Sequence, residues 1–156
     1  MNATFKAPED YDAAVLLDLI REAFVEQNGR IDPPSSMNTL RISDIETHLA
    51  NEMIFVIEEG GTPAACLFGT RKQGALYVGK LSVRLAARGS GHAKRLIAAA
   101  EIEAFAMGLR YLTLIVRREL TENHAFFQHL GFEKFAEARH DGYDTVTEFH
   151  FRKVLL

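Results

Sequence analysis

Three consecutive segments in the middle of the chain have the composition of β-strands, and they constrain the fold more than any other feature. Residues 53–58 and 63–70 flank Glu59-Gly60-Gly61, which favours a tight hairpin turn, and residues 75–84 follow after Gln73-Gly74. Tight turns join antiparallel strands, so the three segments predict a meander. Any further strands must then be added at the edges of that meander.

The segments on either side of the meander predict helices and further strands. Before it we expect a strand at 4–7 and helices at 11–26 and 43–50; after it, a helix at 91–107, a strand at 111–116, a helix at 122–130 and strands at 132–139 and 145–155. The order β-α-α-β-β-β-α-β-α-β-β predicts one domain over residues 1–156 of the α/β class (α+β type). Its sheet is mixed and mostly antiparallel, with six to seven strands flanked by about four helices.

Charge is distributed unevenly along the sequence. Residues 1–59 carry a balance of −8, and residues 60–100 hold seven Lys or Arg and no acid, within a total net charge of −3. A basic block in a mildly acidic protein favours an anionic ligand, although a solvated cationic face gives the same pattern. Because the whole domain is not basic, nucleic acid is not an expected partner.

Other classes of protein find little support in the composition. No apolar stretch approaches the roughly 20 residues of a membrane span, so no membrane partner is expected, and the absence of a secretory signal favours the cytoplasm. The single cysteine, Cys66, lies in an apolar run and is expected to be buried. The six histidines lack ligand spacing, so we predict no metal.

Residues 81–96 form the segment that carries chemistry. A strand end, a turn of small residues and a helix start follow one another there. The N–H groups at a helix N-terminus lack internal partners and lie at the positive end of the helix dipole, so they bind anions. Gly89 and Gly91 let the backbone approach a phosphate, and Arg88, Lys94 and Arg95 add positive charge. A pyrophosphate group is the expected ligand.

The pattern of this turn excludes the common nucleotide sites and resembles another. The Walker sequence is absent, and Lys94 occupies the third small position of the Rossmann pattern. Arg88-x-x-Gly91-x-Ala93 resembles the coenzyme A pyrophosphate loop of the GNAT (Gcn5-related) N-acetyltransferase family. Residues 123–132, which close with a Gly-Phe pair, resemble the second cofactor helix of that family. The order of elements also resembles the GNAT fold over essentially the whole chain.

This resemblance implies an acetyltransferase that uses acetyl-CoA, or another acyl-coenzyme A, as co-substrate. Two central strands would separate after Val83, and the pantetheine arm would pair there with the backbone of Leu81 and Val83. The residues expected to bind the cofactor are Leu81, Ser82, Val83, Arg88, Gly89, Ser90, Gly91, His92, Ala93, Lys94, Arg95, Asn123, Phe126 and Phe127.

The catalytic residues remain open. Many GNAT proteins have a tyrosine, the proton donor to the thiolate, where this chain has Phe127, which cannot donate. The thiolate leaves unaided, or another group replaces the tyrosine; the candidates are Tyr143, Tyr77, His124 and Thr121. Glu22 and Glu26 are candidates for the general base that the acceptor amine requires.

The acceptor predicted from the resemblance is the amine of a small molecule, which attacks the thioester directly in a ternary complex. The acidic residues 1–59 favour a cationic amine, and the stiff loop around Pro33-Pro34 favours a small one. A protein or peptide N-acetyltransferase and a non-catalytic acyl-CoA-binding module are the alternatives. The last strand could also pair with a second copy, which would give a homodimer.

Overall fold

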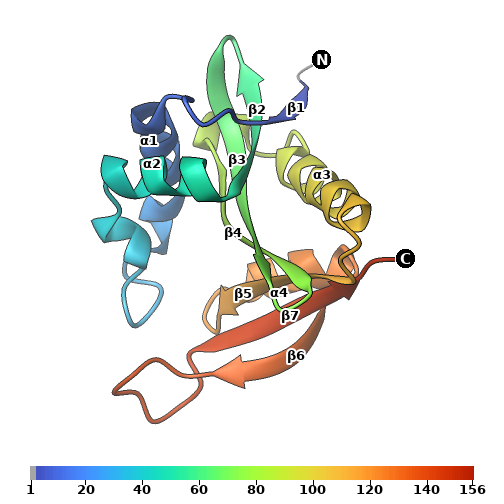
Figure 1. Cartoon of the computed structure of the whole chain (residues 1–156). Helices are drawn as coiled ribbons and strands as arrows, with labels where there is room; N and C mark the ends of the chain where they lie inside the picture. Colours follow the sequence, from blue (N-terminus) through green and yellow to red (C-terminus); the bar gives the residue numbers. More distant parts are fainter. Residues whose placement is uncertain (1–2) are drawn as a thin grey trace.

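The meander forms as the sequence predicts. In the computed structural model, which describes residues 3–156, β2 (Met53–Glu59), β3 (Thr62–Lys72) and β4 (Ala75–Val83) pair antiparallel in that order. β1 (Thr4–Lys6) pairs antiparallel with the free edge of β2. In Figure 1 these strands start at the top of the view, and the hairpin between β3 and β4 reaches down to β5.

A second group of strands completes the sheet. β5 (Tyr111–Arg117) runs parallel to β4, and β7 (Glu148–Val154) lies between β5 and β6 (Glu133–Ala138), antiparallel to both. The seven strands therefore have the order β1-β2-β3-β4-β5-β7-β6. This mixed, mostly antiparallel sheet confirms the predicted fold class and the predicted order of elements.

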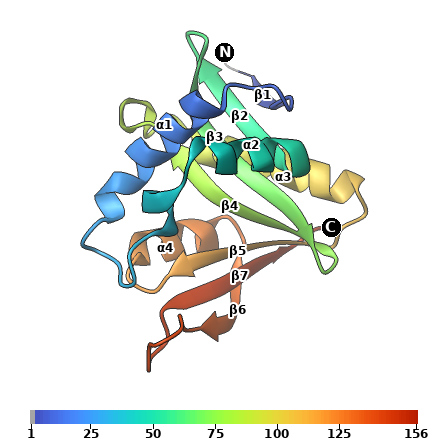
Figure 2. The same cartoon turned by 60° about the vertical axis from the view of Figure 1, so that its left-hand side comes forward.

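Helices cover both faces of the sheet. α1 (Ala13–Phe24) and α2 (Ile42–Asn51) lie together on one face, and α3 (His92–Ala106) and α4 (Thr121–His129) lie on the other (Figures 1 and 2). Three short 3₁₀ turns lie in the connections: η1 (Val25–Gln27), η2 (Ser36–Thr39) and η3 (Leu85–Ala87). Within the described chain, no helix is both long and apolar enough to span a membrane.

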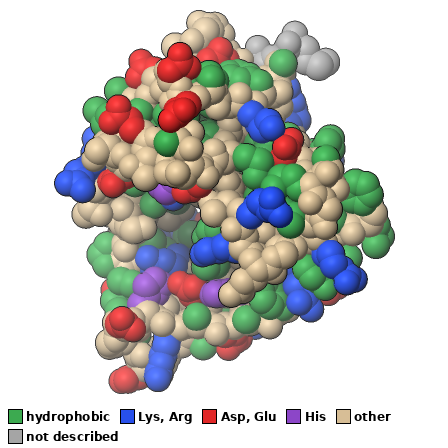
Figure 3. Space-filling view, viewed as in Figure 1, with side chains coloured by type: hydrophobic (Ala, Val, Ile, Leu, Met, Phe, Trp, Pro, Cys, Tyr) green, Lys and Arg blue, Asp and Glu red, His purple; other side chains and the backbone are tan. Residues whose placement is uncertain are grey.

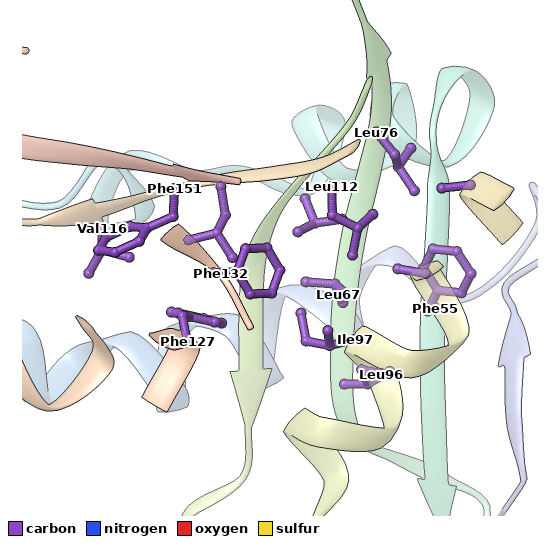
Figure 4. Packing of buried hydrophobic residues seen from close by; sticks show 14 of the residues in the cluster. Phe55, Leu67, Leu76, Leu96, Ile97, Leu112, Val116, Phe127, Phe132 and Phe151 are labelled. Carbon is purple, nitrogen blue, oxygen red and sulfur yellow. The ribbon is translucent and has the colours of Figure 1, made fainter. Parts of the chain in front are cut away.

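The sheet separates two hydrophobic cores because neighbouring residues of a strand point to opposite faces. On β2, Ile54 and Val56 pack under α1 and α2, whereas Phe55 and Ile57 pack under α3. The larger core, seen in Figure 4, also joins the two groups of strands through Leu112 and other residues. Each fully buried side chain of this size contributes about 1.5–3 kcal/mol.

The junction between β4 and β5 is the irregular part of the sheet. The two strands pair at only three positions, of which Tyr77 opposite Thr113 is the last. Beyond this point β4 keeps β3 as its neighbour on one edge, and β5 keeps β7. The separation therefore begins six residues before Val83, whereas the family resemblance implied a separation after Val83. Strand composition predicts a strand over 75–84, and β4 ends one residue earlier, at Val83, but composition carries no information on where pairing stops.

Candidate functional site

A cavity of about 850 Å³ occupies the opening between the two groups of strands. In Figure 3 this face is hollowed, and basic, acidic and histidine side chains gather on the walls of the hollow. The volume lies within the range of sites that bind small molecules. One end of the cavity meets the turn before α3, and the other reaches the side chains of β4, β7 and the loop between β6 and β7. We call these ends the donor end and the acceptor end.

The glycine turn forms the donor end. Gly89 has φ 83° and Gly91 has φ 84°, and in each case the position of a missing Cβ has no atom within 4 Å. Gly91 precedes the first residue of α3, and Arg95 makes the first helical hydrogen bond, to the Gly91 carbonyl at 3.1 Å. The N–H groups of the intervening first turn are those that a helix leaves without internal partners. An anion can approach this turn without displacing a side chain.

Several cofactor candidates from the sequence lie together around this turn. The cavity is lined by Leu81, Val83, Arg88, Gly89, Gly91, His92, Ala93, Lys94, Asn123, Phe126 and Phe127. His92 is 4% exposed, and neither ring nitrogen makes a hydrogen bond, although Nε2 lies 3.4 Å from Glu59 Oε2. The His92 ring is therefore buried beside the glycine turn without a tight polar partner.

Three cofactor candidates are not part of the lining. Ser82 is 1% exposed and its hydroxyl donates to the Lys80 carbonyl at 3.0 Å. The Ser90 hydroxyl donates to the Ala87 carbonyl, which closes the turn from within, and Arg95 is not among the lining residues. Ser82 differs from its neighbours because alternate residues of β4 point to the opposite face of the sheet.

Arg88 lines the cavity, yet it is already engaged. Its guanidinium pairs with Glu26 of η1 and also donates to the Ala23 carbonyl at 3.3 Å. The pair joins the glycine turn to the end of α1 across the mouth of the cavity. A phosphate that binds Arg88 must therefore compete with Glu26.

α4 supplies an apolar wall to the donor end. Phe127 is 7% exposed and its ring packs edge-on against Phe126 and Phe132. Having no hydroxyl, it cannot protonate a leaving group. His124, on the same helix, is bound through Nε2 to the Arg117 carbonyl at 2.8 Å, and neither His124 nor Thr121 lines the cavity.

Tyr77 is the tyrosine that reaches the cavity from β4. A Cβ on Gly79 would lie 3.4 Å from the Tyr77 hydroxyl, so the phenol lies along the strand over Gly79. Burial raises the pKa of Tyr77, and the nearby carboxylates Glu148 and Glu52 raise it further. The phenol therefore keeps its proton at neutral pH and can donate it.

Two other catalytic candidates lie elsewhere. The Tyr143 hydroxyl donates to Asp32 at 2.5 Å, which raises the pKa of Tyr143, and the residue does not line the cavity. Glu22 accepts the Leu85 N–H at 2.9 Å and contacts Arg84 at 3.3 Å. Glu22 thus fixes η3 to α1, outside the lining; of the acidic candidates on this side, Glu26 is the one that lines the cavity.

The acceptor end contains residues that the sequence analysis did not single out as site residues. Four residues line it: Glu52 from the junction between α2 and β2, Lys80 from β4, His140 from the β6–β7 loop and Glu148 from β7. Lys80 has φ 53°, which breaks the alternation of β4 and turns its ammonium to within 5.4 Å of the Phe68 ring centroid. Burial lowers the pKa of Lys80. No motif links these residues, because only strand register brings them together.

The loop before α2 forms the rim of the acceptor end. Arg117 of β5 donates to the Pro33 carbonyl at 2.6 Å and to the Pro34 carbonyl at 3.2 Å. Arg21 of α1 donates to the Leu40 carbonyl at 2.8 Å, at the other end of the loop. Ser35, Ser36 and Met37 of this loop line the cavity. Among residues 3–156 no group of three or more His, Cys, Asp and Glu side chains is arranged to hold a metal ion.

A sheet opened between two parallel central strands, with a glycine turn leading from one of them into a helix, defines the GNAT class of acetyltransferase fold. The sequence profile of the acetyltransferase (GNAT) family matches residues 15–132, and the chain belongs to that family. A search of curated protein sequences finds no match.

Solved structures share this fold at low sequence identity. The PaiA N-acetyltransferase from Thermoplasma acidophilum, in complex with coenzyme A, has a TM-score of 0.81 at 14% identity over 99% of both chains. The ribosomal-protein-S18-alanine N-acetyltransferase from Escherichia coli has a TM-score of 0.76 at 17% identity, over 99% of this chain and 94% of that one. The IAA acetyltransferase from Bacillus cereus has a TM-score of 0.71 at 17% identity, over 99% and 100%.

Proposed function

We propose that the protein transfers an acyl group, in the first place acetyl, from coenzyme A to the amine of a small molecule. The observation that carries this proposal is the continuous cavity, which begins at the glycine turn and ends among ionisable side chains. A donor and an acceptor can therefore enter one cavity from its two ends and meet where β4 and β5 separate.

The donor end suits the pyrophosphate and pantetheine of coenzyme A. The first turn of α3 offers N–H groups to the phosphates, and Lys94 adds a positive charge beside them. Past Tyr77 the edge of β4 that faces β5 has no strand partner, so an amide-bearing arm can pair with it as an added strand. A β4 N–H next to the thioester carbonyl would stabilise the developing oxyanion.

Tyr77 is the residue we assign as proton donor to the departing thiolate, in place of the tyrosine that Phe127 replaces. Its hydroxyl lies over Gly79, close to the point where β4 leaves β5. Its raised pKa keeps the proton available at working pH. A positioned proton donor contributes about 10²–10⁴-fold to the rate of such a step.

Transfer is direct in this proposal, without an acyl-enzyme. The candidate thiol, Cys66, is fully buried, and burial raises its pKa to about 12. Because a thiol reacts as its thiolate, Cys66 is not available as a nucleophile. The amine therefore attacks the thioester itself.

The acceptor is small in this proposal because the rim of the acceptor end is tied down. Arg117 holds Pro33 and Pro34 against β5, which narrows access for an extended peptide. A peptide or protein amine is the alternative substrate. The phenylalanine at position 127 favours a second alternative, a module that binds acyl-CoA without transferring it.

One assay separates these possibilities. Free thiol is measured with acetyl-CoA and a panel of small amines, polyamines, amino acids, aminoglycosides and peptides, alongside the melting temperature with acetyl-CoA. We expect release with one class of small amine. Thiol release with peptides alone would show that the acceptor is a peptide or protein amine. Thermal stabilisation by acetyl-CoA without thiol release would favour the binding module.

A further inference from the structure

Glu148, the first residue of β7, lies between two imidazole rings. His150 Nε2 is 2.7 Å from Glu148 Oε2, and His140 Nε2 is 3.5 Å from Oε1. Each carboxylate oxygen thus has one histidine as its neighbour. The carboxylate is 18% exposed, whereas the histidine side chains are 31% and 29% exposed, so the rings connect a sheltered carboxylate to solvent.

Thr147 orients the ring of His140. Its buried Oγ accepts the His140 backbone N–H at 2.9 Å and lies 2.5 Å from His140 Nδ1. With its proton on Nδ1, His140 donates to the Thr147 hydroxyl oxygen and leaves the lone pair of Nε2 facing the carboxylate, where it can take up a proton. The turn between β6 and β7 therefore holds His140 with Nε2 toward Glu148, 3.5 Å from Oε1.

This group belongs to the acceptor end of the cavity. Glu148 and His140 line the cavity, whereas His150 lies behind them on β7. The charged and titratable groups that face Glu148 are His140 from the loop, His150 from its own strand, Tyr77 from β4 and Arg117, its register partner on β5. The guanidinium of Arg117 is committed to the loop carbonyls of Pro33 and Pro34.

We propose that Glu148, with His140 as its partner, is the general base that takes a proton from the acceptor amine. The inference rests on the proposed acyl transfer and adds a substrate class to it: amines that are protonated in solution and enter as ammonium ions. A carboxylate attracts such an ion, and a linked imidazole, the side chain suited to proton exchange near neutral pH, passes the proton to solvent.

The overall reaction converts an ammonium ion and a thioester into an amide and a thiol, and it releases one proton. The ammonium first gives one proton to the Glu148–His140 pair, and the neutral nitrogen then forms its bond to the thioester carbon. As the carbon–sulfur bond breaks, the thiolate takes a proton from Tyr77, and the second proton lost by the nitrogen restores the Tyr77 hydroxyl. The products are an amide, coenzyme A as its thiol, and one proton released through His140.

Glu148→Gln tests the proposal because it keeps the shape of the side chain and removes its ability to accept a proton. We expect kcat to fall at least a hundredfold while stabilisation by acetyl-CoA is unchanged. The wild-type rate should rise with pH at a point below the pKa of the amine. In the variant, the pH at which the rate rises should move up to the pKa of the amine. The ratio of variant to wild-type kcat should be closer to one for amines of lower pKa. A purely structural role would move neither readout.

Glu137→Gln is the matched control, since Glu137 lies on the neighbouring strand β6, 45% exposed, in a surface pair with Lys134 at 2.7 Å. It should behave as wild type. Undiminished kcat in Glu148→Gln, or a higher KM with an unmoved pH profile, would overturn the base while leaving acyl transfer intact. Wild-type protein that binds acetyl-CoA but releases no thiol with any amine would instead overturn the proposed function, and the base with it.

Discussion

The two ends of the cavity are built on different principles. The donor end is organised around backbone, with side chains of α4 beside it: two glycines, a helix start and an unpaired strand edge lie within residues 77–95. The acceptor end is made of side chains that lie far apart in the sequence, such as Glu52, Lys80 and Glu148. Recognition by backbone requires particular residues at fixed spacing, and so it leaves a motif. Recognition by dispersed side chains depends on register, so that end of the cavity has no motif.

Gly91→Asp should have the largest effect, because it tests whether the donor end works through its backbone. The substitution puts a side chain and a negative charge beside the first turn of α3, where we place the pyrophosphate. Stabilisation by acetyl-CoA should be lost in thermal melts. Gly108→Asp is the control, since Gly108 has a similar φ of 75° and open space at the other end of the same helix. It should suffer the same backbone strain and retain binding.

Tyr77→Phe should have the next largest effect, and it tests whether chemistry requires a side chain at the acceptor end. We expect kcat to fall about a hundredfold, with unchanged stabilisation by acetyl-CoA. Tyr143→Phe removes the same atom outside the cavity lining and should leave turnover within twofold. The reverse result would transfer the role of proton donor to Tyr143.

Arg88→Ala should have a smaller effect on the donor end. Glu26 pairs with the Arg88 guanidinium. The free energy gained when Arg88 contacts a phosphate is therefore reduced by the cost of breaking that pair. The Kd for acetyl-CoA, measured by calorimetry, should rise about fivefold to tenfold, corresponding to about 1–1.4 kcal/mol. Glu26→Gln should tighten binding by releasing Arg88. Equal affinity in Arg88→Ala and wild type would remove Arg88 from the donor end.

Cys66→Ala should have the smallest effect on activity, with kcat within twofold of wild type. The substitution should instead change how the free energy of unfolding depends on pH. Burial raises the pKa of the Cys66 thiol from 9.0 to about 12. Below pH 9 the thiol is protonated in both the folded and the unfolded chain, so its contribution to the free energy of unfolding is fully present. Above pH 9 the unfolded chain ionises and the folded protein does not, and the wild type should lose about 1.4 kcal/mol per pH unit from this group. Urea unfolding at pH 7.5 and 10 should show a shallower loss in the variant, where this thiol is absent.

Local sequence patterns predicted the helices and strands, but they did not predict how strands distant in the sequence, such as β4 and β5, pair with each other. Gly91 and Ala93 pointed to a turn that does line the cavity, because close approach of a ligand to the backbone calls for small residues. Hydrophobic periodicity gave every strand and helix in order, since burial on one or two faces dictates it. The end of the β4–β5 pairing at Tyr77, in contrast, is set by how two half-sheets twist apart. The proximity of Glu148 to Tyr77 depends on the same packing, so neither could be inferred from local pattern.

The catalytic assignments show the same limit. Tyr143, Tyr77 and Glu22 had equal support in the sequence, and only the fold separates them: Tyr77 enters the cavity, whereas the other two tie surface segments together. The cytoplasmic location and the homodimer stay predictions.

The three-position junction between β4 and β5 has a consequence for the amount of folded protein in the cell. Past Tyr77 the edge of β4 that faces β5 has no strand partner among the described residues, so the backbone groups there are open to another hydrogen-bonding partner. An acyl-CoA that pairs with this edge would complete the sheet and so raise the free energy of unfolding in proportion to the logarithm of its concentration. The steady-state amount of folded protein would then follow the supply of acyl donor, and abundance itself would report on metabolism.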